Sequence, residues 1–126
     1  MTIFVFEEES LDKIENMKEI ILSAIDSKNG QDIKVLDVRE QTSIADFFII
    51  ASGNSSTQVT AIADEIEFKM EESGYEKMNR EGYSSARWVL LDYMDIIVHI
   101  FHKDEREYYD LERLWETMEK LEMEEI

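Results

Sequence analysis

The sequence predicts an α/β domain in which a mixed β-sheet is flanked by helices. Short apolar runs typical of strands alternate along the chain with segments whose apolar residues recur every three or four positions, as in helices. Two of the strands form a hairpin, so part of the sheet is antiparallel. The 126 residues contain no Gly/Ser-rich linker and no internal repeat, which favours a single domain over residues 1–126.

The amino-terminal segment predicts one helix preceded by a short apolar stretch. Residues 1–6 (MTIFVF) are expected to form a short strand or a packed arm, and they lack the basic region and cleavage site of a signal peptide. Ser10 is a candidate N-cap for the helix, and Asn29-Gly30 is expected to end it. The apolar stripe of this helix is Ile14, Met17, Ile20, Ile21, Ala24 and Ile25.

Two strands and a second helix follow. Residues 33–38 and 47–52 are predicted strands, and the continuous apolar run FFIIAS at 47–52 is typical of a central strand. Ser55 and Gln58 have the spacing of a capping box, and Gly74 marks the end of the helix. A short extended piece is expected at 75–78. The predicted buried stripe of the second helix is Val59, Ile62, Ala63, Ile66 and Met70.

The run from Ala86 to Trp115 predicts a hairpin with two apolar faces. With Tyr93 and Met94 as the turn, Trp88 is expected to face His99. An antiparallel sheet that meets water on one side alternates apolar with polar residues, and this hairpin does not. Both faces must therefore be covered, and another molecule is one candidate for the cover. The remaining expected pairs are Leu90 with Ile97, Asp92 with Asp95, Val89 with Val98 and Leu91 with Ile96.

The carboxyl-terminal part of the chain predicts a last helix and a tail. The domain core is expected to cover residues 10–118, and residues 119–126 form an acidic tail. The apolar residues of the last helix, at helical spacing, are Leu111, Leu114, Trp115, Met118 and Leu121.

Charge and composition exclude several classes of function. Thirteen Lys and Arg against thirty Asp and Glu give a formal net charge of −17, and no two cations are adjacent. Direct binding to nucleic acid needs clustered cations, so little contact of this kind is expected, and a basic protein is the better partner. There is no cysteine and no apolar run near the ~20 residues of a membrane span. A reducing, cytoplasmic location and no membrane partner are expected.

Two candidate catalytic or ligand sites carry weak signals. The turn at residues 52–56 (SGNSS) resembles a phosphate-binding helix start, and an alternative function is a magnesium-dependent nucleotidyltransferase using Ser55, Ser56, Asp92 and Asp95. The paired carboxylates that such an enzyme needs at alternating strand positions are absent, so a helix cap is favoured. His99 and His102 are three apart on a strand and point to opposite faces, which argues against a metal site.

A protein-binding surface is the stronger hypothesis for the hairpin. Trp88 and Leu90 supply apolar anchors, and His99 is expected either to pack beside Trp88 with one nitrogen bonded or to contact the partner. Asp92 and Asp95 are turn residues that accept backbone hydrogen bonds, or carboxylates that await Lys or Arg from a partner. The expected contact residues are Trp88, Leu90, Asp92, Tyr93, Asp95 and His99.

Five segments in this order resemble the ribosomal silencing factor family, also called RsfS or Iojap-like. The resemblance spans roughly residues 33–115. One position departs from the family pattern, since Met94 stands where the family usually has glycine, the residue that tight turns with positive φ favour. The segments are SIADFFIIASGNS at 43–55, EG at 81–82, WVLLD at 88–92, DIIVHIF at 95–101 and REYYDLERLW at 106–115.

The resemblance implies a specific function. Members have a nucleotidyltransferase-like α/β fold without its catalytic residues, and they need no cofactor or metal. They bind a basic protein of the large ribosomal subunit on the surface that meets the small subunit, block subunit joining and lower translation when nutrients are short. The family also forms homodimers. The expectation for this chain is a non-enzymatic translational repressor in the cytoplasm.

Overall fold

The computed structural model describes the fold of residues 2–109 and the side chains of residues 12–106. Within this range the sheet has five strands in the order β1-β2-β5-β4-β3, and only the β2–β5 pair is parallel, which confirms the mixed sheet. The helices are α1 (Thr2–Ser27), α2 (Ser56–Glu72) and α3 (Lys103–Tyr109). The strands are β1 (Gln31–Asp37), β2 (Phe47–Gly53), β3 (Asn79–Glu81), β4 (Trp88–Asp92) and β5 (Ile96–His102).

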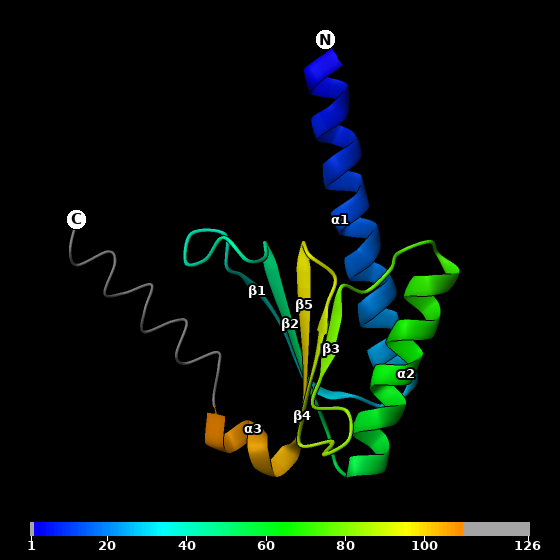
Figure 1. The fold of residues 1–126 in the computed structure, drawn as a ribbon, viewed down its shortest axis with the longest axis vertical. Helices are drawn as coiled ribbons and strands as arrows, with labels where there is room; N and C mark the ends of the chain where they lie inside the picture. The colour runs from blue at the N-terminus through cyan, green and yellow to red at the C-terminus, as the bar shows by residue number, and fades with distance from the viewer. Residues whose placement is uncertain (1, 110–126) are drawn as a thin grey trace, which may run out of the picture.

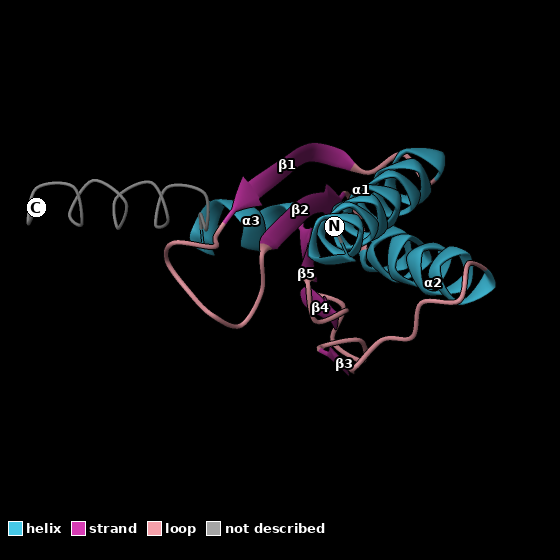
Figure 2. Cartoon of the chain, turned by 90° about the horizontal axis from the view of Figure 1, so that it is seen from above, coloured by secondary structure: helices cyan, strands magenta, loops and turns pink. Residues whose placement is uncertain are grey.

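Helices α1 and α2 lie side by side on the same face of the sheet, and α3 lies at the end of the sheet where β5 finishes (Figures 1 and 2). The main core lies between this helix pair and the sheet. The stripe predicted for α2 is confirmed, since all five of its residues are 0% exposed. The sheet residues that meet the helices include Val89, Leu91, Ile96, Val98 and Ile100.

Both predicted helix ends are confirmed by their hydrogen bonds. Gly74 has φ +87°, and the next residue, Tyr75, donates its N–H to the carbonyl of Met70 at 2.9 Å, as in a Schellman motif. At the end of α1 the left-handed residue is Asn29, with φ +61°. The N–H of Gly30 then reaches the carbonyl of Ile25 at 2.9 Å.

The predicted start of α2 is also confirmed, with one difference in the capping box. Ser55 Oγ accepts the N–H of Gln58 at 3.1 Å. Gln58 Oε1 accepts from Asn54, at 2.6 Å, instead of from the N-cap residue itself. The side-chain amide of Gln58 also donates to the carbonyls of Lys28 and Asn29, at 3.1 and 2.9 Å. Gln58 thereby joins the start of α2 to the end of α1.

Two boundary predictions are wrong. Helix α1 begins at Thr2, so the segment 2–6 is helical and Ser10 lies inside the helix instead of capping it. No proline or glycine precedes Gly30, so nothing interrupts the propagation of the helix. The extended piece expected at 75–78 is instead β3, at Asn79–Glu81, because the turn after α2 uses the intervening residues. The residues predicted for the last helix from Leu111 onward and the acidic tail lie outside the described residues.

The hairpin is present, but its predicted register is wrong by two residues. Trp88 pairs with Phe101 and Leu90 pairs with His99. Tyr93 still belongs to the ladder, since its N–H donates to the carbonyl of Ile96 at 2.9 Å, and the turn falls on Met94 and Asp95. Strand β4 itself ends at Asp92, and the Tyr93 side chain after it joins the buried helix side. A shift of two leaves every side chain on its predicted face.

Candidate functional site

The candidate binding surface is the sheet face that α1 and α2 do not cover (Figure 2). We call it the sheet surface. Trp88, Leu90 and Asp92 of β4 are half-buried, and His99 of β5 is 5% exposed. These side chains share one face because they alternate along paired strands. The structure thus brings together most of the predicted contact residues.

Trp88 and His99 form a bonded aromatic pair at the centre of the sheet surface. The indole N–H of Trp88 donates to Nδ1 of His99 at 3.1 Å, which confirms that His99 packs beside Trp88 with one nitrogen bonded. The ring of Phe48 contacts His99 edge-on, with ring centroids 4.7 Å apart. The indole ring also stacks on Phe101 at 4.9 Å.

His99 is held in its neutral form. Burial lowers the pKa of His99 to about 4, because the charged imidazolium is disfavoured away from water. Since Nδ1 accepts a hydrogen bond, the proton of the neutral ring lies on Nε2. Nε2 is buried and has no hydrogen-bond partner among the described residues. The pair therefore presents an apolar aromatic surface without a histidine charge at neutral pH.

Asp92 and Asp95 supply negative charge beside this aromatic pair. Asp92 Oδ1 accepts the N–H of Met94 at 2.8 Å, which confirms its role as a turn residue. The carbonyl of Asp95 accepts the N–H of Asp46 at 2.9 Å and that of Phe47 at 3.1 Å. Among the ion pairs of the described side chains, none includes Asp92 or Asp95. Their charges are therefore not neutralised by Lys or Arg within that part of the chain.

Tyr93 does not belong to the sheet surface, contrary to the prediction. Its side chain is 5% exposed and lies in the core on the helix side. Burial raises the pKa of Tyr93, and the charges of Glu67 and Glu71 raise it further. The Tyr93 side chain is therefore not accessible to a partner that binds the sheet surface.

Sequence reasoning missed the residues that support this surface from β2, β5 and the loop before β2. A second apolar cluster underlies it, and Leu90 packs against this cluster. The continuous apolar run at 47–52 could have indicated it, because a strand apolar at every position needs cover on both faces. The buried members are Val38, Ala45, Phe48 and Ile97.

The structure separates the residues of the alternative nucleotidyltransferase site. Ser55 caps α2 beyond the end of β2, whereas Asp95 bonds to residues at the beginning of β2. The seven residues of β2 lie between them, a separation of about 20 Å at the usual rise of a strand. The hydroxyl of Ser52 accepts a hydrogen bond from Arg106 at 2.7 Å. Ser55 and Ser56 therefore do not share a site with Asp92 and Asp95.

The two histidines also lie apart, as predicted. His102 Nδ1 is 3.6 Å from a carboxylate oxygen of Asp104 beside α3, whereas His99 bonds to Trp88. Over the described part of the chain, no group of three or more His, Asp or Glu side chains is placed to hold a metal ion. In the same part, none of the helices is both long and apolar enough to cross a bilayer.

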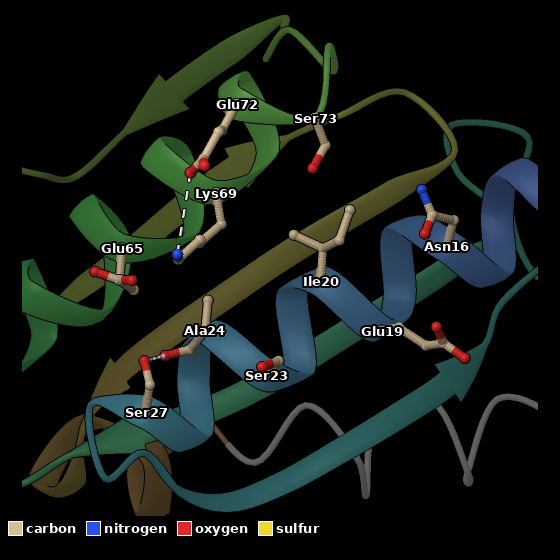
Figure 3. Close-up of a pocket in the computed structure, with 10 residues that line it drawn as sticks. All are labelled: Asn16, Glu19, Ile20, Ser23, Ala24, Ser27, Glu65, Lys69, Glu72 and Ser73. Carbon is tan, nitrogen blue, oxygen red and sulfur yellow. Dashed lines mark hydrogen bonds and ion pairs between the residues drawn. The ribbon is translucent and has the colours of Figure 1, made fainter.

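A groove of about 700 Å³ lies between α1 and α2, on the other side of the sheet (Figure 3). Its charged side chains include Glu65, Lys69 and Glu72, and Lys69 and Glu72 lie 4.0 Å apart. The hydroxyl of Ser27 donates to the backbone carbonyl of Ala24 at 2.8 Å, so it is not bonded to a catalytic base. The arrangement of these side chains does not form a nucleophile–base pair.

The fold and the site define a small α/β domain whose helices occupy one face of a mixed sheet and whose other face carries an aromatic and acidic surface. The family model for "Ribosomal silencing factor during starvation" matches residues 11–126. This chain belongs to the ribosomal silencing factor family.

Individual relatives are similar to this chain over most of its length. It is 44% identical over 110 residues to ribosomal silencing factor RsfS of Halalkalibacterium halodurans, covering 87% of this chain and 94% of the relative. It is 49% identical over 96 residues to RsfS of Bacillus subtilis, covering 76% and 81% of the two chains. A crystal structure of a protein from Chromobacterium violaceum superposes with a TM-score of 0.79 at 36% identity, covering 81% of this chain and 85% of that one.

Proposed function

We propose that this protein represses translation by binding a basic protein of the large ribosomal subunit and blocking its association with the small subunit. Membership of the silencing-factor family supports a ribosome-associated repressor. The observation that carries the proposal is a sheet face that holds half-buried Trp88 and Leu90 together with Asp92. Neither Asp92 nor Asp95, at the adjoining turn, has an ion pair among the described side chains. Such a surface suits a cationic, partly apolar protein.

The proposed mechanism is steric and requires no catalysis. A folded chain of this length has a radius of gyration of about 14 Å. A body of this size is thick enough to hold the surfaces of the two ribosomal subunits apart. Trp88 and Leu90 would supply apolar contact area, and the two aspartates would pair with Lys or Arg of the partner. The net charge of −17 favours a protein target over ribosomal RNA.

The first prediction concerns the sheet surface directly. Trp88→Ala combined with Asp92→Ala is expected to weaken binding to purified large ribosomal subunits about 100-fold, because an aromatic anchor and a charge pair are both lost. Co-sedimentation through a sucrose cushion at increasing protein concentration measures the change. Binding of the unmodified chain should also weaken as salt is raised, since salt screens the charge pairs.

A matched control separates the site from general effects of substitution. Phe68→Ala with Glu72→Ala removes an exposed aromatic and an exposed acid from α2, on the helix side, and should leave co-sedimentation unchanged. Circular dichroism should show that both double variants are folded. Equal binding by the two double variants and the unmodified chain would end the assignment of the sheet surface.

We also propose that the protein is not an enzyme. Calorimetric titration with a nucleoside triphosphate and Mg²⁺ is expected to show no saturable heat, because Ser55 and Asp95 lie at opposite ends of β2. A polymerase-type nucleotidyltransferase active in the same buffer serves as the positive control. A saturable isotherm at micromolar to millimolar nucleotide would contradict this prediction.

The homodimer implied by the family resemblance remains a proposal. The face of the sheet under α1 and α2 is already covered, so the sheet surface is the apolar sheet face that a second copy could pair with. A dimer formed through the sheet surface would compete with the ribosomal partner.

A further inference from the structure

Three loops lie at the same end of the sheet, where β1 and β4 end and β2, β3 and β5 begin (Figure 1). Two backbone contacts tie them together. The N–H of Asp46 donates to the carbonyl of Asp95 at 2.9 Å, and the N–H of Met78 donates to the carbonyl of Asp92 at 2.7 Å. We call residues 38–46, 75–78 and 93–95 the loop edge. It directly continues the end of the sheet surface that carries Asp92.

Each of these loops exposes one large apolar side chain. Ile44 is 65% exposed, Met78 is 63% exposed and Met94 is 59% exposed. The other exposed large apolar side chains in the described part of the chain are Phe68 on α2, at 60%, and Val35 on β1, at 42%. Single exposed apolar residues are ordinary, but three at the same end of the sheet are candidates for contact with a partner.

Met94 is also in a backbone conformation that does not suit it. Its φ is +72°, in the left-handed region where a β-carbon is strained and glycine is not. Because the Met94 side chain is 59% exposed, it contributes little to the core. The fold alone would therefore favour glycine at this turn. An outlier of this kind supports a role outside the fold, and methionine is an adaptable contact residue.

The charge beside these side chains is negative. Asp46, Asp92 and Asp95 take part in no ion pair among the described side chains. Both cations of the loop edge are paired, since the Nε of Arg39 donates to Asp37 Oδ1 at 2.9 Å and the Nζ of Lys77 lies 3.8 Å from a carboxylate oxygen of Glu67. An apolar edge with this charge is complementary to a surface that carries Lys or Arg around an apolar patch.

We propose that the loop edge is the outer part of the partner-binding surface, with Ile44, Met78 and Met94 packing on the apolar part of a basic protein. This inference rests on the proposed function and extends it to residues outside the hairpin strands. The partner then spans the sheet surface and the loop edge, and the aspartates between them meet its cations. Nucleic acid is disfavoured because the edge would repel phosphate.

The test uses Met94→Gly, which removes the side chain and relieves the backbone strain. The variant is expected to melt at the same temperature or higher, yet to bind purified large ribosomal subunits about five-fold more weakly, as for partial burial of one methionine. Adding Ile44→Ser and Met78→Ser should weaken binding by about 50-fold in total. Phe68→Ser is the control, since it removes an equally exposed side chain from the helix side and should bind normally.

The outcomes separate this inference from the proposed function. Failure of the unmodified chain to bind would reject the proposed function itself. Normal binding by the triple variant, together with loss of binding by Trp88→Ala with Asp92→Ala, would overturn the loop-edge inference alone. Light scattering at several protein concentrations tests whether a second copy of this chain occupies the loop edge. If the triple variant loses self-association but keeps ribosome binding, the edge contacts a second copy and the inference is overturned.

Discussion

Gly82→Ala is expected to destabilise the protein by about 3 kcal/mol or more. Gly82 has φ +78°, and a β-carbon there would overlap the carbonyl oxygen of Trp88 and lie 3.1 Å from its carbonyl carbon. The left-handed conformation alone disfavours alanine by about 1–2 kcal/mol. The rest of the loss of stability comes from overlap with backbone atoms of β4, which cannot move aside as a flexible side chain can. Urea denaturation at neutral pH gives the free energy of unfolding.

Gly74→Ala is the matched control for this variant. Gly74 also has positive φ, at +87°, but a β-carbon there would meet nothing within 4 Å. Its expected cost is therefore about 1 kcal/mol, from the backbone conformation alone. Equal losses of stability in the two variants would show that β4 does not approach Gly82 as closely as described. Because Gly82 lies against the backbone of Trp88, Gly82→Ala should also weaken partner binding, and Gly74→Ala should not.

The second large effect is a loss of stability in acid that depends on His99. Its pKa is about 4 in the folded protein and about 6.5 in the unfolded chain. Between these values the unfolded chain binds a proton that the folded protein excludes. The contribution of neutral His99 to the free energy of unfolding is therefore fully present above pH 6.5 and is lost as the pH falls toward 4. The expected loss is about 3 kcal/mol.

His99→Asn tests the origin of this pH dependence. The asparagine oxygen can accept the indole N–H of Trp88 as Nδ1 does, but the side chain does not titrate. The variant is expected to have a lower free energy of unfolding at pH 7. Between pH 7 and pH 4, its free energy of unfolding should fall by about 3 kcal/mol less than that of the unmodified chain. Carboxylates that titrate in this range are common to both proteins, so they cancel in the difference. Parallel stability curves would show that His99 is not buried in neutral form.

Much of the local structure followed from residue patterns. The buried stripe of α2, its Ser55 cap and its Gly74 end were predicted, because periodicity and capping are properties of short segments. The start of α1 was not predicted. Ser10 has the chemistry of a cap, but a cap requires the chain to leave the helix there, and no residue before it forces that change.

The candidate binding surface was predicted only in part. The alternation of residues assigned Trp88, Leu90 and Asp92 to one face, and the structure agrees because a register error of two preserves the faces. Tyr93 was misplaced because the turn was set one residue too early. Its burial depends on α1 and α2 covering that face of the sheet, which no local pattern in the hairpin indicates.

The sequence by itself determined the helices and strands, the faces of the hairpin, the acidic charge and the family, since these depend on residue type and spacing within single segments. Only the tertiary structure decided that both long helices cover the same face and that Ser55 and Asp95 lie at opposite ends of a strand. It also decided that three exposed apolar residues, from loops 34 and 16 positions apart in sequence, lie at the same end of the sheet (Ile44, Met78 and Met94). The physical reason is that strand order is set by burial shared among distant segments, which no single segment encodes.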